Sequence, residues 1–200
     1  MKKNVSGGVI VLIVVLIVAA TIGIWAMNTY NGFVSLRTDT QGGWAQVETQ
    51  YQRRADLVPQ LVAVVEGAAD FEKSVLVDVT EARTNWLNTA ADPSATIDDN
   101  IQASSSFDSA LSRLLVTVES YPTLTATESF VTLQSQLEGT ENRVAVARQD
   151  YNDLVRVYNT AIELVPSSMV AGMFDFDAFP FFESMEGAED APEVEFEFGE

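Results

Sequence analysis

Charged and polar side chains gather in two stretches where the apolar residues are regularly spaced. The first stretch contains Arg53, Arg54, Asp56 and Glu72, and the second contains Glu138, Glu141, Asn142, Arg143 and Arg148. Arg54 and Glu72 fall where the spacing otherwise places apolar residues. A charge at such a position must be paired or hydrogen-bonded, because burying an isolated ion is costly. We therefore predict ion pairs between two helices that fix their alignment. The candidate pairs join Arg54 or Arg53 to Glu141 or Glu138.

The same residues have a second interpretation, in which they contact other copies of the chain. Membrane-anchored copies lying side by side would form a ring or an array, and complementary charges would select the partner surface. Both interpretations stay open at this point, and both place the charged residues in contacts between helices.

Catalysis has little support, because the chain contains no Cys and no His. Their absence excludes disulfides, thiolate nucleophiles, Ser-His-Asp triads and the HExxH metal helix. The remaining carboxylates form no tight cluster with the spacing of metal ligands. We predict a protein that is not an enzyme and that binds no cofactor and no metal. A hydrolase built from carboxylates alone is the least favoured alternative.

The charge balance excludes another class of partner. The formal net charge is −18, and ten acidic residues without a single base lie between Asp175 and Glu200. Nucleic-acid-binding surfaces are basic, because they must neutralise phosphates. We expect no nucleic-acid partner.

The element that positions everything else is an apolar segment near the N-terminus. No charged residue occurs between Lys3 and Arg37, and the most apolar part runs from Val9 to Met27. As a helix this part would be about 28 Å long, close to the thickness of a bilayer core. The apolar run is longer than the roughly 7–15 residues of a cleaved signal peptide. We therefore predict that residues 1–30 form an uncleaved signal-anchor that spans the lipid bilayer once.

The orientation of this anchor follows from the few charges beside it. Lys2 and Lys3 outnumber Arg37, so the positive-inside rule places the N-terminus in the cytoplasm. The bulk of the chain would then be periplasmic or extracellular, on a cell membrane.

Beyond the anchor, the apolar spacing predicts long helices over residues 31–166. Residues 38–43 (TDTQGG) predict a break, since each glycine disfavours helix by about 1 kcal/mol. A helix should then run from Trp44 to Trp86, continuing across Pro59 with a kink. Residues 88–100 form the clearest loop, with Pro93 in a Ser/Thr/Asp cluster.

Two further helices complete the prediction. One carries Ile97, Ile101, Leu111 and Val118 on its apolar side and ends near residues 121–122. A capping box at residues 125–128 precedes the other. Its apolar residues alternate steps of three and four, which is typical of coiled coils. They are Phe130, Leu133, Leu137, Thr140, Val144, Ala147, Tyr151, Leu154, Tyr158, Ala161 and Val165.

The predicted fold class is therefore all-α. A single transmembrane helix leads into an antiparallel bundle of three long helices, and an acidic, Phe-rich tail covers residues 167–200. The end of that tail, residues 192–198, alternates apolar and acidic side chains and predicts a short strand. A disordered acidic tail is the equal alternative.

Several motifs occur in a recognisable order. Residues 30–37 read Tyr30-Asn31-x-Phe-Val-Ser-Leu-Arg37, and the next group holds Trp44-x-Gln-Val-Glu, Arg53-Arg54-Ala-Asp56-Leu-Val-Pro59, Glu72 and Thr80-Glu-Ala-Arg83. The late motifs are Glu119-x-Tyr121-Pro122, Leu133-Gln134, Glu138-x-Thr140-Glu141-Asn142-Arg143, Ala147-Arg148, Tyr151-Asn152, Tyr158-Asn159 and Pro192-x-Val-x-Phe196. Together they resemble the LemA family of bacterial membrane-anchored proteins. Gly42-Gly43 and Gln60 depart from the family pattern.

The resemblance implies one N-terminal transmembrane helix, a bundle of long antiparallel helices and no established catalytic activity. It also implies the opposite membrane orientation to the one that the charges indicate, which we retain. Family relatives in magnetosome membrane formation imply a role in membrane organisation, and others encoded beside membrane metalloproteases imply envelope maintenance. Our leading hypothesis is a self-associating, membrane-anchored scaffold of the cell envelope or of a membrane assembly. The alternative is an adaptor or accessory subunit of a membrane protease or signalling complex.

Overall fold

The computed structural model describes residues 7–67 and 71–182, and these residues form helices and loops without a strand. The helices are α1 (Gly7–Glu66), α2 (Lys73–Ala91), α3 (Ile97–Val118), α4 (Pro122–Thr125), α5 (Glu128–Glu163) and α6 (Ser167–Met173). The all-α class is therefore confirmed for the described residues. The predicted strand at residues 192–198 lies outside them.

Helix α1 is a single helix of 60 residues, which is about 90 Å long. The break predicted at residues 38–43 is wrong. A side chain at Gly43 would place its Cβ only 2.7 Å from Cδ1 of Leu154 and 3.6 Å from Cα of Tyr151, both on α5. The glycine lets the two helices approach closely, and packing of α1 on α5 outweighs the low helix propensity of glycine.

The helix continues across Pro59, as predicted, but only as far as Glu66. The predicted continuation to Trp86 is wrong, because the chain leaves α1 at Gly67 and begins α2 at Lys73. Glycine is common just past the end of a helix. The apolar spacing persists across this break because α2 returns to the same core, where Val65 and Val79 are both fully buried. The described residues therefore form four long helices where three were predicted.

The loop between α2 and α3 is shorter than predicted. Helix α2 runs to Ala91, and Thr96 caps α3 in a capping box with Asp99. The capping box predicted at residues 125–128 is wrong. Thr125 ends the short helix α4, and Thr127 caps α5 by accepting a hydrogen bond from the backbone N–H of Phe130.

Helix α5 buries the predicted positions from Phe130 to Tyr151, and also Tyr158. Near its end, Val155 and Ile162 are buried in place of the predicted Leu154 and Ala161. A straight helix drifts by about 20° per heptad against a strict 3.5-residue repeat, so the buried face moves on by one residue over several heptads. The predicted core position at Val165 lies beyond the helix and is exposed.

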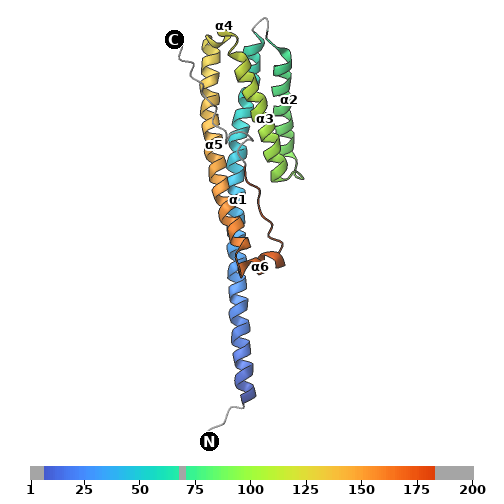
Figure 1. The fold of residues 1–200 in the computed structure, drawn as a ribbon, viewed down its shortest axis with the longest axis vertical. Coiled ribbons are helices and arrows are strands. Elements are labelled where there is room, and N and C mark those ends of the chain that lie inside the picture. Colours follow the sequence, from blue (N-terminus) through green and yellow to red (C-terminus); the bar gives the residue numbers. More distant parts are fainter. Residues whose placement is uncertain (1–6, 68–70, 183–200) are drawn as a thin grey trace, which may run out of the picture.

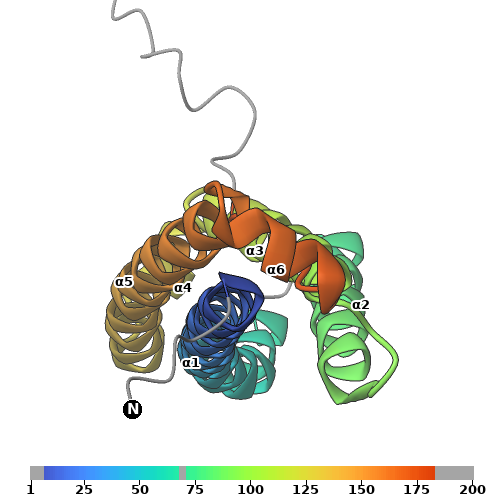
Figure 2. The ribbon, with the colours of Figure 1, turned by 90° about the horizontal axis from the view of Figure 1, so that it is seen from below.

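The long helices lie side by side, and each runs in the opposite direction to the one before it (Figure 1). Helix α5 returns along α1, and α3 returns along α2. Seen along the helices, α5 and α2 lie on opposite sides of α1 (Figure 2). The core between them contains Tyr51 and Leu61 of α1, Phe107 and Leu114 of α3, and Tyr151 of α5, each with at most 1% of its surface exposed.

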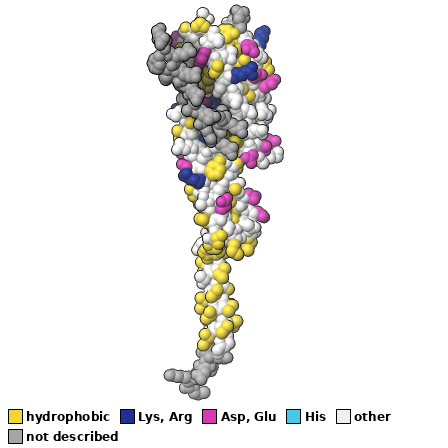
Figure 3. All heavy atoms as spheres, in the orientation of Figure 1, with side chains coloured by type: hydrophobic (Ala, Val, Ile, Leu, Met, Phe, Trp, Pro, Cys, Tyr) yellow, Lys and Arg dark blue, Asp and Glu magenta, His cyan; other side chains and the backbone are white. Residues whose placement is uncertain are grey.

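The first part of α1, residues 7–25, is exposed throughout and extends beyond the other helices as a bare apolar segment, which we call the stalk (Figures 1 and 3). Its residues from Val9 to Val18 are 46% to 63% exposed. Among the described helices, α1 is the one that is long and apolar enough to cross a membrane, with a window of mean hydropathy 3.0. The predicted domain boundary at residue 30 lies within this helix.

Residues 167–182 pack against the other helices. The bundle of α1 beyond the stalk with α2, α3 and α5 is called the body below. Helix α6 lies across the base of this body, close to α1 (Figure 1). The chain then turns and runs back along the body as an extended segment, residues 176–182, which we call the strap. Phe176 and Phe182 of the strap are buried.

Candidate functional site

The most unusual polar feature of the structure is a buried charge cluster, which consists of Arg54, Asp108, Glu141 and Arg148. Asp108, on α3, lies at its centre. Arg54 of α1 donates to Oδ1 of Asp108, and Arg148 of α5 donates to Oδ2. The hydroxyl of Tyr51 also donates to Oδ2, at 2.7 Å. One carboxyl group therefore joins α1, α3 and α5.

Arg54 makes a second ion pair, with Glu141 of α5. Arg54 and Asp108 are buried, with side chains 4% and 8% exposed, whereas the Glu141 side chain is 59% exposed. The two arginines balance the two acids, so the cluster has no net formal charge. A buried cluster of this kind contributes little net stability, but removing one member is expensive.

The electrostatics of the cluster are dominated by burial. Burial raises the pKa of Asp108 to about 7, while the charge and hydrogen bond of Arg54 act in the opposite direction. Burial likewise lowers the pKa of Arg54, against the charge of Asp108, and lowers the pKa of Arg148. The cluster is therefore sensitive to the loss of any of its three less exposed charges, those of Arg54, Asp108 and Arg148.

Beside the cluster, Asn152 and Asn159 of α5 hold the strap. The Asn159 amide donates to the carbonyl of Phe179 and accepts from its N–H, both at 2.9 Å. Asn152 does the same with Phe182, again at 2.9 Å in both bonds. The two asparagines are seven residues apart on a helix, and their partners are three residues apart in an extended segment. Both separations are about 10 Å, so the two pairs of hydrogen bonds can form together. We call this pair of asparagines the strap clamp.

Arg148 connects the strap clamp to the charge cluster. Its guanidinium lies 4.8 Å from the ring centroid of Phe182 and 5.3 Å from that of Tyr51. The ring of Phe182 also stacks on Trp44 at a centroid distance of 5.6 Å. The C-terminal end of the strap is thus packed directly against the charge cluster.

The structure brings together only part of the predicted set of polar residues. Arg54, Glu141 and Arg148 meet in the cluster. The others are exposed, namely Arg53, Asp56, Glu72, Glu138, Asn142 and Arg143. The core position predicted for Glu72 is wrong, because the chain leaves the helix before it, and its carboxylate accepts from the Ser74 hydroxyl instead.

Sequence reasoning missed Asp108 and the strap clamp. The burial of Asp108 could have been predicted, because this residue falls on the apolar face of α3. That face alternates steps of four and three through Ile97, Ile101, Ser104, Asp108, Leu111, Leu115 and Val118. For the repeated Tyr-Asn motif, the prediction placed the rings of Tyr151 and Tyr158 in the core, where both are buried. It counted the adjacent asparagines among the polar residues of this helix but gave them no individual role.

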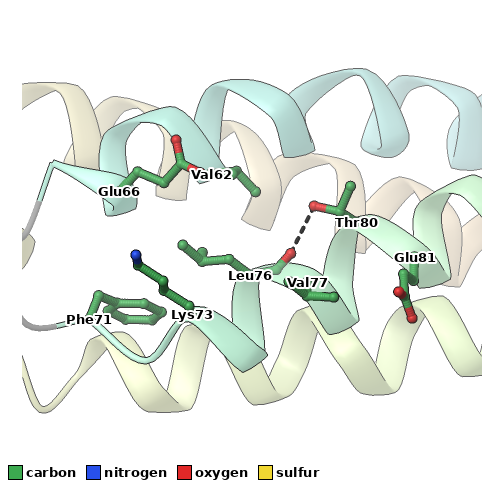
Figure 4. A pocket seen from close by; sticks show the side chains of 8 residues that line it. All are labelled: Val62, Glu66, Phe71, Lys73, Leu76, Val77, Thr80 and Glu81. Carbon is green, nitrogen blue, oxygen red and sulfur yellow. Dashed lines mark hydrogen bonds between the residues drawn. The ribbon is translucent and has the colours of Figure 1, made fainter.

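A groove of about 610 Å³ opens between α3 and α5 beside the charge cluster. Arg54, Asp108 and Glu141 line part of it, and apolar side chains such as Leu115 and Leu137 line much of the rest. A second hollow of about 740 Å³ lies between the end of α1 and the start of α2 (Figure 4). Its Thr80 hydroxyl is already bonded to the backbone of Leu76. Within the described ranges, no three acidic residues form a group that could hold a metal ion.

Comparison with known proteins gives a consistent family match. The sequence model of the LemA family matches residues 43–196. Magnetosome proteins MamQ 1 and MamQ 2 of Paramagnetospirillum magneticum are each 28% identical over 195 residues, which cover 87% of this chain and 71% of the relative. Protein LemA of Metamycoplasma hominis is 21% identical over 188 residues, covering 92% of this chain and 84% of the relative.

Proposed function

Since the chain belongs to the LemA family, we propose that it is a membrane-anchored, non-enzymatic scaffold that self-associates to organise the cell envelope or a membrane assembly. The observation that carries this proposal is the continuity of α1, which joins the bare apolar stalk to the core of the body in one helix. Any arrangement of the bodies would therefore also arrange the membrane segments.

The stalk supports a single-pass anchor. Its apolar side chains are exposed, and leaving so many of them in water is unfavourable. In a bilayer they would face lipid, with the antiparallel helices of the body beyond the membrane. From the charges, we place the body on the periplasmic or extracellular side.

Self-association is supported by surfaces on both the stalk and the body. Ala19 and Gly23 form a small-xxx-small pair on the stalk, which allows anchor helices to approach closely. On the body, valines of several helices are 51% to 65% exposed, namely Val77, Val116, Val131, Val146 and Val157. The names of the MamQ relatives, magnetosome proteins, are compatible with a role at a membrane-bounded structure.

The non-enzymatic part of the proposal rests on the state of the polar groups. The chain has no Cys and no His. The buried charges are bound to one another. Asp108, for example, already accepts hydrogen bonds from two arginines and a tyrosine. Such a cluster holds three helices in place and offers no free general base.

The mass of the full chain extracted in mild detergent tests self-association. We expect particles of several copies at micromolar protein concentration. A single copy per micelle at that concentration would contradict the scaffold proposal. The variant Gly23→Leu, which removes the small-residue surface, should shift the mass distribution toward smaller particles, and Ile22→Leu is the matched control.

An adaptor of a membrane protease or signalling complex is the second candidate. In this alternative the acidic, Phe-rich tail is the docking segment, and the groove between α3 and α5, whose apolar lining is open, is a second place for a partner. The structure also narrows the test, because residues 167–182 pack on the body and only residues 183–200 should be deleted. Loss of partners from a pull-down after this deletion would support docking through that segment, whereas an unchanged set of partners would contradict it.

A further inference from the structure

The base of the body carries an exposed apolar segment that the proposed scaffold does not explain. Residues 164–174 contain no charged side chain and include all of α6. Five large apolar residues of this segment point outward, with exposures of 58% for Leu164, 83% for Val165, 72% for Met169, 74% for Met173 and 51% for Phe174. We call residues 164–174 the foot.

The foot is held in place by its inner face. Val170 and Ala171 are 5% exposed and pack in one cluster with Phe33 of α1 and Phe176 of the strap. Immediately after the foot, Asp175 adopts a left-handed conformation, with φ of 53°. That conformation is common for the residue that ends a helix, and here the chain turns into the strap. The exposed apolar face is therefore not a frayed end of the chain.

The level of the foot relative to the stalk is set by ring contacts. Phe174 packs against Tyr30 of α1 with a centroid distance of 4.9 Å. Tyr30 lies three residues beyond Met27, the end of the apolar span, which is about 4.5 Å along the helix. The headgroup layer on each side of a bilayer is about 5–8 Å thick. If α1 spans a bilayer, the foot lies in the headgroup layer.

We propose that the foot is a second membrane contact, which lies in the interface of the same bilayer that α1 spans. This inference rests on the proposed membrane anchor. The bilayer is the occupant because the apolar surface of the foot continues that of the stalk, and hydrophobic side chains gather where the wide body meets the stalk (Figure 3). A segment without charge needs no anionic lipid, so a neutral membrane suffices.

This contact would fix the body relative to the membrane. A single spanning helix leaves the body free to tilt and rotate, because tilt is set by packing and by interfacial anchors. A foot on one side of α1 supplies a second anchoring point, so each copy would present the same sides of its body to its neighbours.

The chain lacks cysteine, so single-cysteine variants can place a fluorescent probe at chosen sites. The full chain is reconstituted in phosphatidylcholine vesicles with the environment-sensitive probe NBD at Met169→Cys or Met173→Cys. Val116→Cys, on α3 and 65% exposed, is the matched control, and Val14→Cys, on the stalk and 53% exposed, reports the anchor. Quenching by lipids with a spin label at a shallow position on the acyl chain measures contact with the interface.

We expect the foot probes to be blue-shifted and to lose much of their emission to the shallow spin label, because an interfacial helix buries its apolar face about 5–10 Å into the headgroup boundary. The probe at position 116 should stay unquenched. If position 14 is quenched by lipid but the foot probes behave like position 116, the foot proposal fails and the anchor stands. Blue-shifted but unquenched foot probes would show that protein covers the foot, which also overturns the proposal. If position 14 itself is unquenched, the anchor fails.

Discussion

Replacing Arg54 with methionine tests the charge cluster most directly. Methionine keeps a long, unbranched side chain at this buried position of α1 but lacks the guanidinium that binds both Asp108 and Glu141. Breaking a buried pair costs about 3–5 kcal/mol. The ion pair between Arg54 and the exposed Glu141 accounts for less than about 1 kcal/mol of this cost. Because Arg148 still binds Asp108, we expect a loss of about 3 kcal/mol in the free energy of unfolding at pH 8.

The cost should depend on pH, with a sign that the pKa of Asp108 sets. Its ordinary value of 3.8 is raised to about 7 in the fold, so the folded chain holds a proton that the unfolded chain has released between these values. The free energy of unfolding therefore falls as pH rises through this window. Removing Arg54 raises the pKa of Asp108 further, so in the variant the fall continues above pH 7. The variant should thus lose more stability at pH 8 than at pH 5.5.

Denaturant unfolding of the full chain in micelles, followed by far-UV circular dichroism at both pH values, measures this cost. Arg53→Met is the matched control, because the neighbouring arginine is exposed. An exposed substitution should change stability by less than about 0.5 kcal/mol. A loss below about 1 kcal/mol for Arg54→Met at both pH values, or a larger loss at pH 5.5, would refute the reasoning about buried charge.

Further substitutions test contacts at three other places. Asn152→Ala removes two hydrogen bonds to the strap and should cost about 1–3 kcal/mol. It should also speed chymotrypsin cleavage at the strap phenylalanines, whereas the exposed Asn142→Ala should leave the cleavage rate unchanged. Gly42→Ala meets nothing within 4 Å and should raise the thermal midpoint by adding up to about 1 kcal/mol. Gly43→Ala, whose Cβ would lie 2.7 Å from Cδ1 of Leu154, should raise that midpoint less or lower it, because Leu154 must move, and equal gains at the two glycines would contradict the contact of α1 with α5. Thr96→Ala removes the capping box of α3 and should cost about 1 kcal/mol in chemical unfolding, while no loss would show that the cap is dispensable.

The helices were predictable where local spacing decides the structure. The alternating steps of three and four from Phe130 to Tyr151 predict that these positions face the core, and the structure buries them. The spacing around residues 67–72 was misleading, because α1 and α2 face the same core and their registers happen to agree. The glycines at 42 and 43 predicted a break because the residue that packs on Gly43, Leu154, is more than a hundred residues away in the sequence.

The charge cluster was half predictable. Arg54 stands out because it interrupts an apolar face, and Asp108 interrupts one on α3 in the same way. Which acid an arginine meets depends on how helices align, and that alignment is a tertiary property. The strap clamp could not be predicted from Asn152 and Asn159 alone, since it requires knowing that residues 176–182 return along α5.

Electron microscopy of the full chain in lipid tests the central claim, that anchored copies associate through a helix shared by membrane and body. The account predicts particles in which several elongated bodies stand side by side on one membrane, with their stalks gathered in the bilayer. Lipid particles that each carry a single isolated body, at protein concentrations that would populate an assembly, would contradict it.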